Sequence, residues 1–272
     1  GTGQTRLTFS SASDYYPSWS PDGTKIAFSS RRDGVDYEIY VMNANGSGVT
    51  RLTNAAGDDT TPAWSPNGTK IAFVTARGGI LGDAHIWVMN AEGSNPVKLT
   101  PTGTGLNTSP TWSAVGTEVV FRSDRSGATE IWKMNSDGSN QGRIDPCPGL
   151  TAGYFDYAPV YSPNGQEIAV SSNRDNTGNI WVMGSQGTCF GANIIQVTRS
   201  LRVGGGTTWS PDGNSLAFHS QHEQPGLSNQ IYTISRDGTG LAKLTTIGQN
   251  TFPSWATGEE LPAILAIDYA TA

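Results

Sequence analysis

The chain has 272 residues and a formal net charge of −6, with 34 Gly, 15 Pro and 8 Trp. This length predicts one large domain or two small ones, and it is sufficient to bury a core without help from a metal or a disulfide. An acidic chain lacks the basic face that phosphate contacts need, and no apolar run approaches the roughly 20 residues that span a bilayer. We therefore expect no nucleic-acid partner and no membrane span. Because the chain starts at Gly1 without a signal-peptide core, we expect a processed mature protein or a fragment.

One motif recurs along the chain with a period of 45 to 49 residues. It consists of an aromatic residue, usually followed by Ser and a Pro-Asp-Gly or Pro-Asn-Gly turn. Its aromatic positions are Trp19, Trp64, Trp112, Tyr161, Trp209 and Trp255, the last in a copy that keeps only part of the motif. Pro, Asx and Gly favour a tight turn, and a β-rich segment such as residues 25–28 follows it. A period of this length is typical of a four-stranded propeller blade, and we expect the aromatic residues to pack between blades.

Two further strands complete each predicted repeat. The third contains Ile and then an aromatic residue, as in residues 38–42, and an Asn-Gly hairpin leads to a fourth strand at residues 50–53. The fourth-strand pattern also occurs at residues 5–8, so we predict that this N-terminal strand joins the last blade and closes the ring. The predicted fold is all-β, a single six-bladed β-propeller of four-stranded antiparallel blades over residues 1–272. The predicted blades lie near residues 14–53, 59–100, 107–145, 156–198, 204–245, and 250–272 plus 1–10.

The segment from Tyr16 to Phe28, with the Glu-Ile-Tyr-Val-Met-Asn and Arg-Leu-Thr segments that follow, resembles the TolB-type, WD-like propeller repeat. The resemblance covers essentially the whole chain. It implies an extracytoplasmic propeller, periplasmic or secreted, that is mostly non-catalytic. It also implies that partners bind at the central mouth, where calcium can bind as well.

Oxygen-bearing side chains stand five positions before most of the repeated aromatic residues. They are Asp14, Asp59, Asn107, Asp156 and Asn250, with Gly204 at the corresponding position of the fifth repeat. Because these positions precede the innermost strand, we expect their side chains to converge on the propeller axis at one mouth. Hard cations such as Ca²⁺ prefer carboxylate and amide oxygens, so the five residues are a candidate calcium site.

A second ring of residues offers a competing interpretation. Arg32, Arg77, Arg125, Arg174 and His222 stand between the predicted second and third strands, on the same expected face. Each arginine can pair with an Asp or a backbone carbonyl of its own or the next blade, which would make the ring architectural and leave the carboxylates neutralised. The other interpretation is that Arg32, Arg125 and Arg174 contact a ligand.

Aromatic residues outside the repeat pattern gather before the inner strands of blades one, four and six. They are Tyr15, Tyr16, Tyr154, Phe155, Tyr157 and Phe252. Aromatic faces near an acidic mouth suit sugar rings or peptide side chains. Tyr15, Tyr16 and Tyr157 are therefore candidate ligand-binding residues for a protein, peptide or glycan, although packing within the loops would also explain them.

The positions of the three histidines indicate whether the chain could hold a catalytic metal site. His219 and His222 stand near Gln221 and Gln224, and oligogalacturonate lyases resemble this fold and use a metal bound by His and Gln. The third histidine, His85, lies three predicted blades away, which argues against joint metal ligation. The sequence contains no nucleophile motif, phosphate loop or dinucleotide fingerprint. We predict no catalytic residues, with a polysaccharide lyase or hydrolase as an alternative.

The two cysteines, Cys147 and Cys189, interrupt the repeat in adjacent blades, and the sequence leaves open whether they form a disulfide. The preferred hypothesis is a non-catalytic binding or scaffold propeller that engages its partner at an acidic central mouth. A structural unit that assembles through its blade edges into a surface layer or filament is a second alternative.

Overall fold

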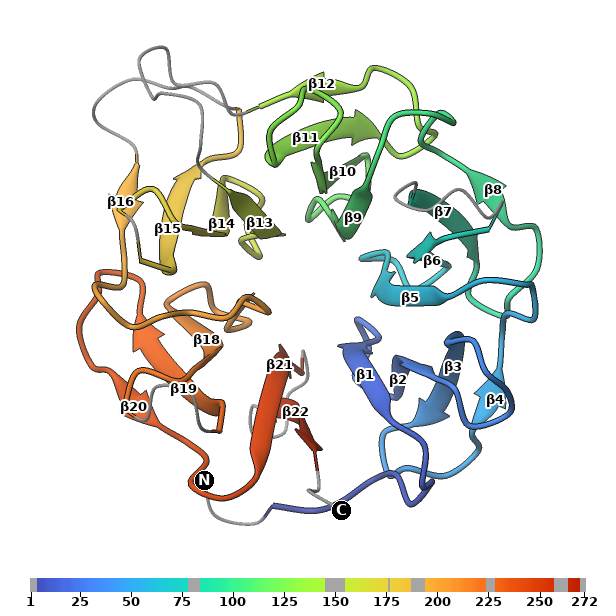
Figure 1. The fold of residues 1–272 in the computed structure, drawn as a ribbon, viewed down its shortest axis with the longest axis horizontal. Coiled ribbons are helices and arrows are strands. Elements are labelled where there is room, and N and C mark those ends of the chain that lie inside the picture. The colour runs from blue at the N-terminus through green and yellow to red at the C-terminus, as the bar shows by residue number, and fades with distance from the viewer. Residues whose placement is uncertain are drawn as a thin grey trace.

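A computed structural model describes residues 4–77, 84–144, 155–175, 177–186, 194–223, 228–256 and 264–269, the last of these beyond Ile264 as backbone only. Cys147, Cys189, Tyr154 and Gln224 lie outside the described residues. The described residues form 22 strands, arranged in sheets that radiate from one central axis (Figure 1). Among the residues described, no helix is long and apolar enough to cross a membrane.

Five sheets have four antiparallel strands in simple sequence order. We call them blades one to five. Blade one contains β1 (Asp14–Trp19), β2 (Lys25–Ser30), β3 (Glu38–Asn43) and β4 (Thr50–Arg51). Blade two contains β5 (Asp59–Trp64), β6 (Lys70–Thr75), β7 (His85–Asn90) and β8 (Val97–Lys98). Blade three contains β9 (Asn107–Trp112), β10 (Glu118–Ser123), β11 (Glu130–Asn135) and β12 (Gly142–Arg143).

Blade four contains β13 (Asp156–Tyr161), β14 (Glu167–Ser172), β15 (Asn179–Gly184) and β16 (Ile195–Gln196). Blade five contains β17 (Thr208–Trp209), β18 (Ser215–Ser220), β19 (Gln230–Ser235) and β20 (Ala242–Lys243). The sixth sheet has only two strands, β21 (Gln249–Trp255) and β22 (Ile264–Tyr269).

The prediction of six four-stranded blades closed by the N-terminal strand is therefore wrong, because the structure has five such blades and one two-stranded sheet. In every four-stranded blade the fourth strand pairs with the third, as β4 does with β3. The described C-terminal residues supply β21 and β22 and no third strand. Residues 5–8 consequently have no ladder to join, and they form no strand.

The innermost strands carry a bulge that the sequence marks with proline. The β1–β2 register shifts between Tyr15 and Ser18, and the same shift occurs in blades two, three and four and in the sixth sheet. Proline has no N–H to give to a ladder, which makes a bulge its natural place. The residue before each proline has a left-handed φ between 49° and 54°, at Tyr16, Thr61, Ser109, Ala158 and Phe252.

The core lies between neighbouring sheets. Alternate residues of each second strand face opposite neighbours, so Ala27 packs toward blade two while Ile26 and Phe28 pack with Leu7 of the N-terminal segment. Four of the repeated aromatic residues lie in these interfaces, namely Trp64, Trp112, Tyr161 and Trp209, and the indole N–H of Trp112 donates to the carbonyl oxygen of Ala63 in blade two at 3.0 Å. The prediction that the aromatic residues pack between blades is confirmed for these four.

Candidate functional site

The predicted ring of oxygen-bearing residues is paired with the predicted ring of arginines. The guanidinium of each arginine binds the Asp or Asn 18 residues earlier, in the same blade. The distances are 3.0 Å for Arg32 to Asp14, 2.5 Å for Arg77 to Asp59, 2.6 Å for Arg125 to Asn107 and 2.6 Å for Arg174 to Asp156. The pairing follows from strand geometry, because the first residue of the inner strand is opposite the last residue of the second strand, two residues before the arginine.

Three of these arginines also stack against aromatic rings of their own blade. The guanidinium carbon of Arg125 lies 4.5 Å from the ring centre of Trp132, and Arg32 and Arg77 have similar neighbours. Arg125 faces the neutral Asn107 rather than a carboxylate, and burial lowers its pKa. The architectural interpretation of the arginine ring is thus supported in blades one to four.

The five candidate calcium ligands do not meet at one point. Asp59 and Asn107 are completely buried, and the side chains of Asp14 and Asp156 face arginines in separate blades. Asn250 donates to the carbonyl oxygen of Ile247 at 2.7 Å. Within the described parts of the chain, no group of three or more His, Cys, Asp or Glu side chains is placed to hold a metal ion. As placed, the residues do not fit a shared calcium site.

Calcium binding at this ring stays a prediction that titration can test. If the ring rearranges to bind calcium, adding Ca²⁺ to chelator-treated protein will release or absorb heat, and Asp59→Asn/Asp156→Asn will abolish that signal. The double variant removes two of the three carboxylates while keeping their size. Equal titration curves for the two proteins, or no heat with either, would contradict the prediction.

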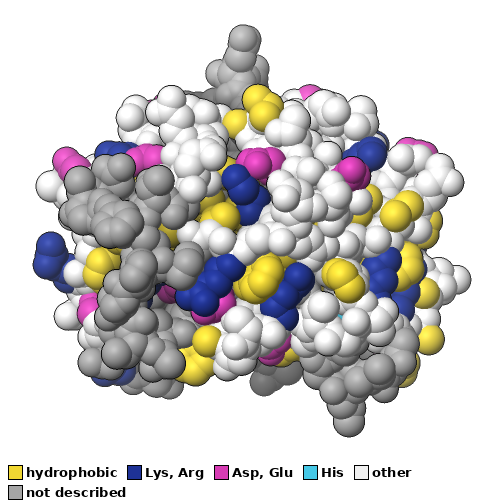
Figure 2. All heavy atoms as spheres, turned by 90° about the horizontal axis from the view of Figure 1, so that it is seen from above, with side chains coloured by type: hydrophobic (Ala, Val, Ile, Leu, Met, Phe, Trp, Pro, Cys, Tyr) yellow, Lys and Arg dark blue, Asp and Glu magenta, His cyan; other side chains and the backbone are white. Residues whose placement is uncertain are grey.

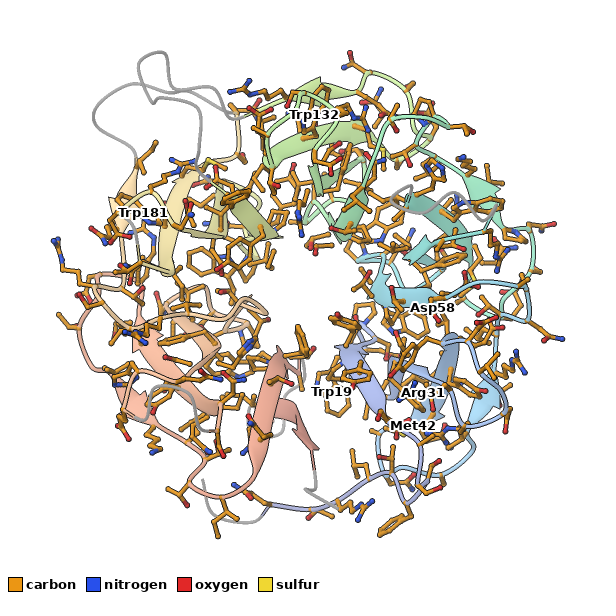
Figure 3. All side chains as sticks on the ribbon, in the orientation of Figure 1. Trp19, Arg31, Met42, Asp58, Trp132 and Trp181 are labelled. Atoms are coloured by element: carbon orange, nitrogen blue, oxygen red, sulfur yellow. The ribbon has the colours of Figure 1, made fainter. Side chains whose placement is uncertain are left out.

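An axial cavity of about 170 Å³ opens where the inner strands approach one another. It is lined by bulge residues, among them Tyr16 and Phe252, and by Gly206 of blade five, and none of the five candidate calcium ligands lines it. In Figure 3 Trp19 lies on the inner strand beside the open centre, and Arg31 and Asp58 lie farther out. The axis is therefore surrounded by positions two residues after the Asp and Asn ring, which are bulges in every sheet except blade five.

A chain of aromatic rings from three sheets runs past this cavity, and two of its members, Tyr16 and Phe252, line the cavity. We call Tyr37, Tyr15, Tyr16, Phe252 and His219 the aromatic arc. The ring centres are 5.3 Å apart for Tyr37 and Tyr15, 6.0 Å for Tyr15 and Tyr16, 4.4 Å for Tyr16 and Phe252, and 5.3 Å for Phe252 and His219. Tyr15, Tyr16, Tyr37 and Phe252 are partly exposed, whereas His219 is buried. The arc joins blade one, the sixth sheet and blade five.

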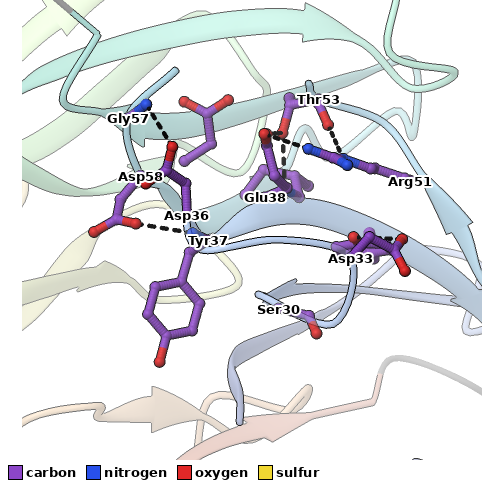
Figure 4. A network of polar contacts seen from close by, with 12 residues as sticks. Ser30, Asp33, Asp36, Tyr37, Glu38, Arg51, Thr53, Gly57 and Asp58 are labelled. Carbon is purple, nitrogen blue, oxygen red and sulfur yellow. Dashed lines mark hydrogen bonds and ion pairs between the residues drawn. The ribbon is translucent and has the colours of Figure 1, made fainter. Parts of the chain in front are cut away.

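Polar contacts between blades one and two hold one end of the arc. The backbone N–H of Tyr37 donates to Asp58 at 2.8 Å, and that of Gly57 donates to Asp36 at 3.0 Å (Figure 4). The guanidinium carbon of Arg31 lies 5.2 Å from the ring centre of Tyr37. Burial and the hydrogen bond with Tyr15 raise the pKa of Tyr37 to about 12. The phenol of Tyr37 is therefore a neutral hydrogen-bonding group at physiological pH.

Glycines in blade five make room for the other end of the arc. A Cβ at Gly204 would lie 2.5 Å from Nε2 of His219, and one at Gly206 would lie 3.0 Å from the Cα of Phe252. Burial lowers the pKa of His219 to about 4, so its ring is neutral at pH 7, and Nδ1 accepts the N–H of Phe252 at 3.3 Å. Gly204 stands where the other sheets have Asp or Asn, and the imidazole ring leaves no room for a side chain there.

The remaining predicted residues lie apart from the arc. The hydroxyl of Tyr157 donates to the carbonyl oxygen of Val203 at 3.2 Å. His222 lies against Tyr232, with ring centres 4.7 Å apart, and His85 is buried in blade two. The structure does not bring the three histidines together, as expected from their positions in the repeat. Sequence reasoning did not include Tyr37 and His219 among the ligand-binding residues, although both depart from the repeat pattern.

The outer edge of the propeller differs from the central mouth in the side chains that it exposes. On the edge seen in Figure 2, apolar and basic side chains alternate, and the coloured residues form no broad apolar patch. Val49, Val97, Ile195 and Leu241, which lie in or beside fourth strands, are exposed singly. Scattered apolar residues are normal on a protein surface. This edge therefore offers no specific observation in favour of self-assembly.

Radial antiparallel sheets around an axial cavity define the chain as a β-propeller. A family model for the TolB β-propeller domain matches residues 2–81 and 151–267. The chain belongs to this family, which confirms the resemblance seen in its repeats. No curated protein is similar enough in sequence to match the chain.

Several solved structures share the fold. A TolB candidate from Agrobacterium tumefaciens superposes with a TM-score of 0.77 at 18% identity, over 95% of this chain and 91% of that protein. TolB from Acinetobacter baumannii gives 0.73 at 20% identity, over 90% of this chain and 57% of that one. An oligogalacturonate lyase from Vibrio parahaemolyticus gives 0.55 at 15% identity, over 97% and 92% of the two chains. At these identities the likeness concerns the fold alone.

Proposed function

We propose that this propeller is a non-catalytic binding module that engages an extended peptide or a flexible protein segment at one mouth of its axial cavity. The observation that carries the proposal is the aromatic arc. Its central rings, Tyr16 and Phe252, lie on inner strands and line the cavity. Partly exposed aromatic side chains around a concavity are the usual anchors of a recognition site.

The surroundings of the arc favour a polypeptide over a sugar. Phe155 and Ile247 lie in segments that lead into inner strands, which places them at the same end of the propeller as the arc. They are 52% and 83% exposed, respectively. Such apolar side chains gain more from contact with peptide side chains than with hydroxylated sugar rings. The extracytoplasmic location that we propose rests on the resemblance to the TolB-type repeat.

The arc also explains why several sheets must cooperate in binding. Tyr15 and Tyr16 come from β1, Phe252 from β21 and His219 from β18. A ligand that contacts the exposed rings therefore touches blade one and the sixth sheet, while the buried His219 of blade five lies against Phe252 and supports it. The relative positions of these sheets are fixed by the interfaces between them. Rigid presentation lowers the entropy lost on binding, which is the advantage of building the site on a closed ring.

Selection from a peptide library displayed on phage tests the proposal. We expect the wild-type protein to enrich peptides whose affinity falls about tenfold or more in Tyr16→Asn, because buried aromatic anchors dominate binding energy. Asn tolerates the left-handed backbone at this position, where φ is 53°. The matched control is Phe9→Ala, which removes an aromatic ring that is 80% exposed and outside the arc. Peptides that bind Tyr16→Asn as tightly as the wild type would contradict the proposal.

A further inference from the structure

Arg122 places a positive charge at a position that is uncharged at pH 7 in the other four-stranded blades. It is the fifth residue of β10. The corresponding residues of the other second strands are Ser29, Val74, Ser171 and His219. Val120, two residues earlier on β10, packs against blade four, and the alternation of side chains along a strand places Arg122 on the same face. Arg122 therefore lies between blades three and four.

The equivalent side chains of blades four and five have hydrogen-bond partners. Nδ1 of His219 accepts the N–H of Phe252 at 3.3 Å, and the hydroxyl of Ser171 lies 3.3 Å from that of Thr207. Arg122 is partly buried, and its Nε is fully buried without a hydrogen-bond partner in the described structure. Removing a cation from water without pairing it costs free energy. The described fold thus carries this charge without a contact that offsets its cost.

The first two residues of β13 lie on the blade-four side of this interface, and neither offers a free negative charge. The carboxylate oxygens of Asp156 bind Arg174 at 3.2 Å and 2.6 Å. Burial raises the pKa of Tyr157, and the positive charge of Arg122 opposes this increase, so the two side chains are within electrostatic range of each other. The phenol of Tyr157 is neutral at pH 7. Its hydroxyl donates to the carbonyl oxygen of Val203 at 3.2 Å.

A second buried polar atom accompanies Arg122 on the same face of blade three. Thr108 is opposite Arg122 in the β9–β10 register, and directly opposed residues of an antiparallel pair project to the same side. The hydroxyl oxygen of Thr108 is buried, and it has no hydrogen-bond partner among the residues that the structure describes. A guanidinium can only donate hydrogen bonds, and a hydroxyl can also donate one. The pair therefore suits an oxygen atom that carries negative charge.

The wall of the axial cavity beside this pair is built from small side chains. Ser109 and Ala158, which line the cavity, directly follow the two inner-strand residues that flank Arg122. The corresponding residues of blade one and the sixth sheet are Tyr16 and Phe252, which line the cavity as well. Strands β9 and β13 lie across the centre from β1 and β21 (Figure 1). The cavity consequently has an aromatic wall on one side and room beside a cation on the other.

We propose that Arg122 and Thr108 bind a carboxylate of the peptide that occupies the axial cavity. The inference rests on the proposed peptide-binding function and specifies its ligand as an acidic peptide. An apolar side chain of the peptide contacts Tyr16 and Phe252, and its carboxylate lies across the axis between blades three and four. A single guanidinium matches the single charge of a carboxylate, and their charge-assisted hydrogen bonds are screened less at a partly buried site than in bulk water.

Acetate is the first probe, because it presents a carboxylate without a peptide. At equal ionic strength, replacing chloride by about 0.1 M acetate should raise the melting temperature of the wild type by about 1–2 °C more than that of Arg122→Gln. In chloride alone the variant should melt no lower than the wild type, because it loses an unpaired cation. The matched control is Lys133→Gln, which removes a cation of β11 that already pairs with Glu118 at 3.0 Å. It should respond to acetate as the wild type does.

Peptides selected from the phage library test the same contact in the proposed ligand. Those that depend on Tyr16 should carry Asp or Glu, and the neutral amide in its place should weaken binding to the wild type about tenfold or more. The same change should hardly affect binding to Arg122→Gln, and Arg122→Glu should select Lys or Arg instead. Synthetic peptides with free and amidated C-termini identify the other source of a carboxylate, since amidation abolishes the affinity only if the chain end binds Arg122.

Two results would overturn the inference. One is an equal response of the wild type and Arg122→Gln to acetate. The other is a set of Tyr16-dependent peptides that bind as tightly without any carboxylate, a result that would leave the proposed peptide binding intact. A selection that yields no Tyr16-dependent peptide would instead refute the proposed function, and the acetate comparison would still decide whether Arg122 binds a carboxylate.

Discussion

Replacing Arg77 by Met is expected to lower the free energy of unfolding by about 3–5 kcal/mol, because it leaves a buried carboxylate without its cation. Asp59 is completely buried, and Arg77 is its ion-pair partner at 2.5 Å. Methionine keeps much of the apolar stem of the side chain, so the loss of unfolding free energy reports mainly the removal of the positive charge. Urea-induced unfolding of the variant and the wild type measures the difference.

Blade three provides the matched control for this experiment. Arg125 occupies the same position as Arg77, but it faces the neutral Asn107. Arg125→Met should therefore cost only about 1–2 kcal/mol, as expected for lost hydrogen bonds between buried groups. Adding Asp59→Asn to Arg77→Met should recover much of the loss. Equal losses in blades two and three would contradict the charge-based explanation.

Acidification from pH 7 to pH 4 should remove about 3 kcal/mol of stability through His219 alone. Burial among Gly204, Gly206 and Phe252, none of which carries a charge, lowers its pKa from 6.5 to about 4. Between pH 6.5 and pH 4, this histidine therefore binds a proton in the unfolded chain but stays neutral in the folded protein. The contribution of the neutral ring is fully present above pH 6.5 and is lost as the pH falls toward 4.

Glutamine at position 219 keeps a hydrogen-bond acceptor but does not titrate. Stability of His219→Gln should therefore depend less steeply on pH between 6.5 and 4 than that of the wild type, in urea unfolding at several pH values. A His219→Gln profile parallel to that of the wild type would show that the imidazole can be protonated in the folded protein.

The repeat pattern was sufficient to predict most of the fold. The turn after each aromatic residue and the proline of each inner strand are local signals. They recur because the strands of every blade pack against neighbouring sheets in the same way. The last sheet was not predicted correctly because, among the described C-terminal residues, Ile264–Tyr269 form one strand, β22, where the prediction needed two. Residues 5–8 carry a genuine fourth-strand pattern, but a strand also needs a neighbour to pair with.

The candidate site was harder to predict because it arises from departures from the repeat. Asp59 and its equivalents share a sequence position, which suggested a ring at the axis, yet each side chain turns toward the arginine of its own blade. His219 and Tyr37 belong to different blades, and only the closure of the ring brings them into one arc with Phe252. The one available signal was an aromatic or imidazole ring at a position that other repeats fill differently.

Hydrogen–deuterium exchange with a peptide selected by phage display tests the binding proposal most directly, because it locates the contact without a substitution. Binding at the aromatic arc should slow amide exchange in residues 14–19 and 249–255, which contain β1 and β21. The hairpins at the opposite end of the propeller, such as residues 43–47, should exchange as they do in the free protein. Protection confined to those hairpins or to the outer strands, with β1 and β21 unchanged, would contradict the account.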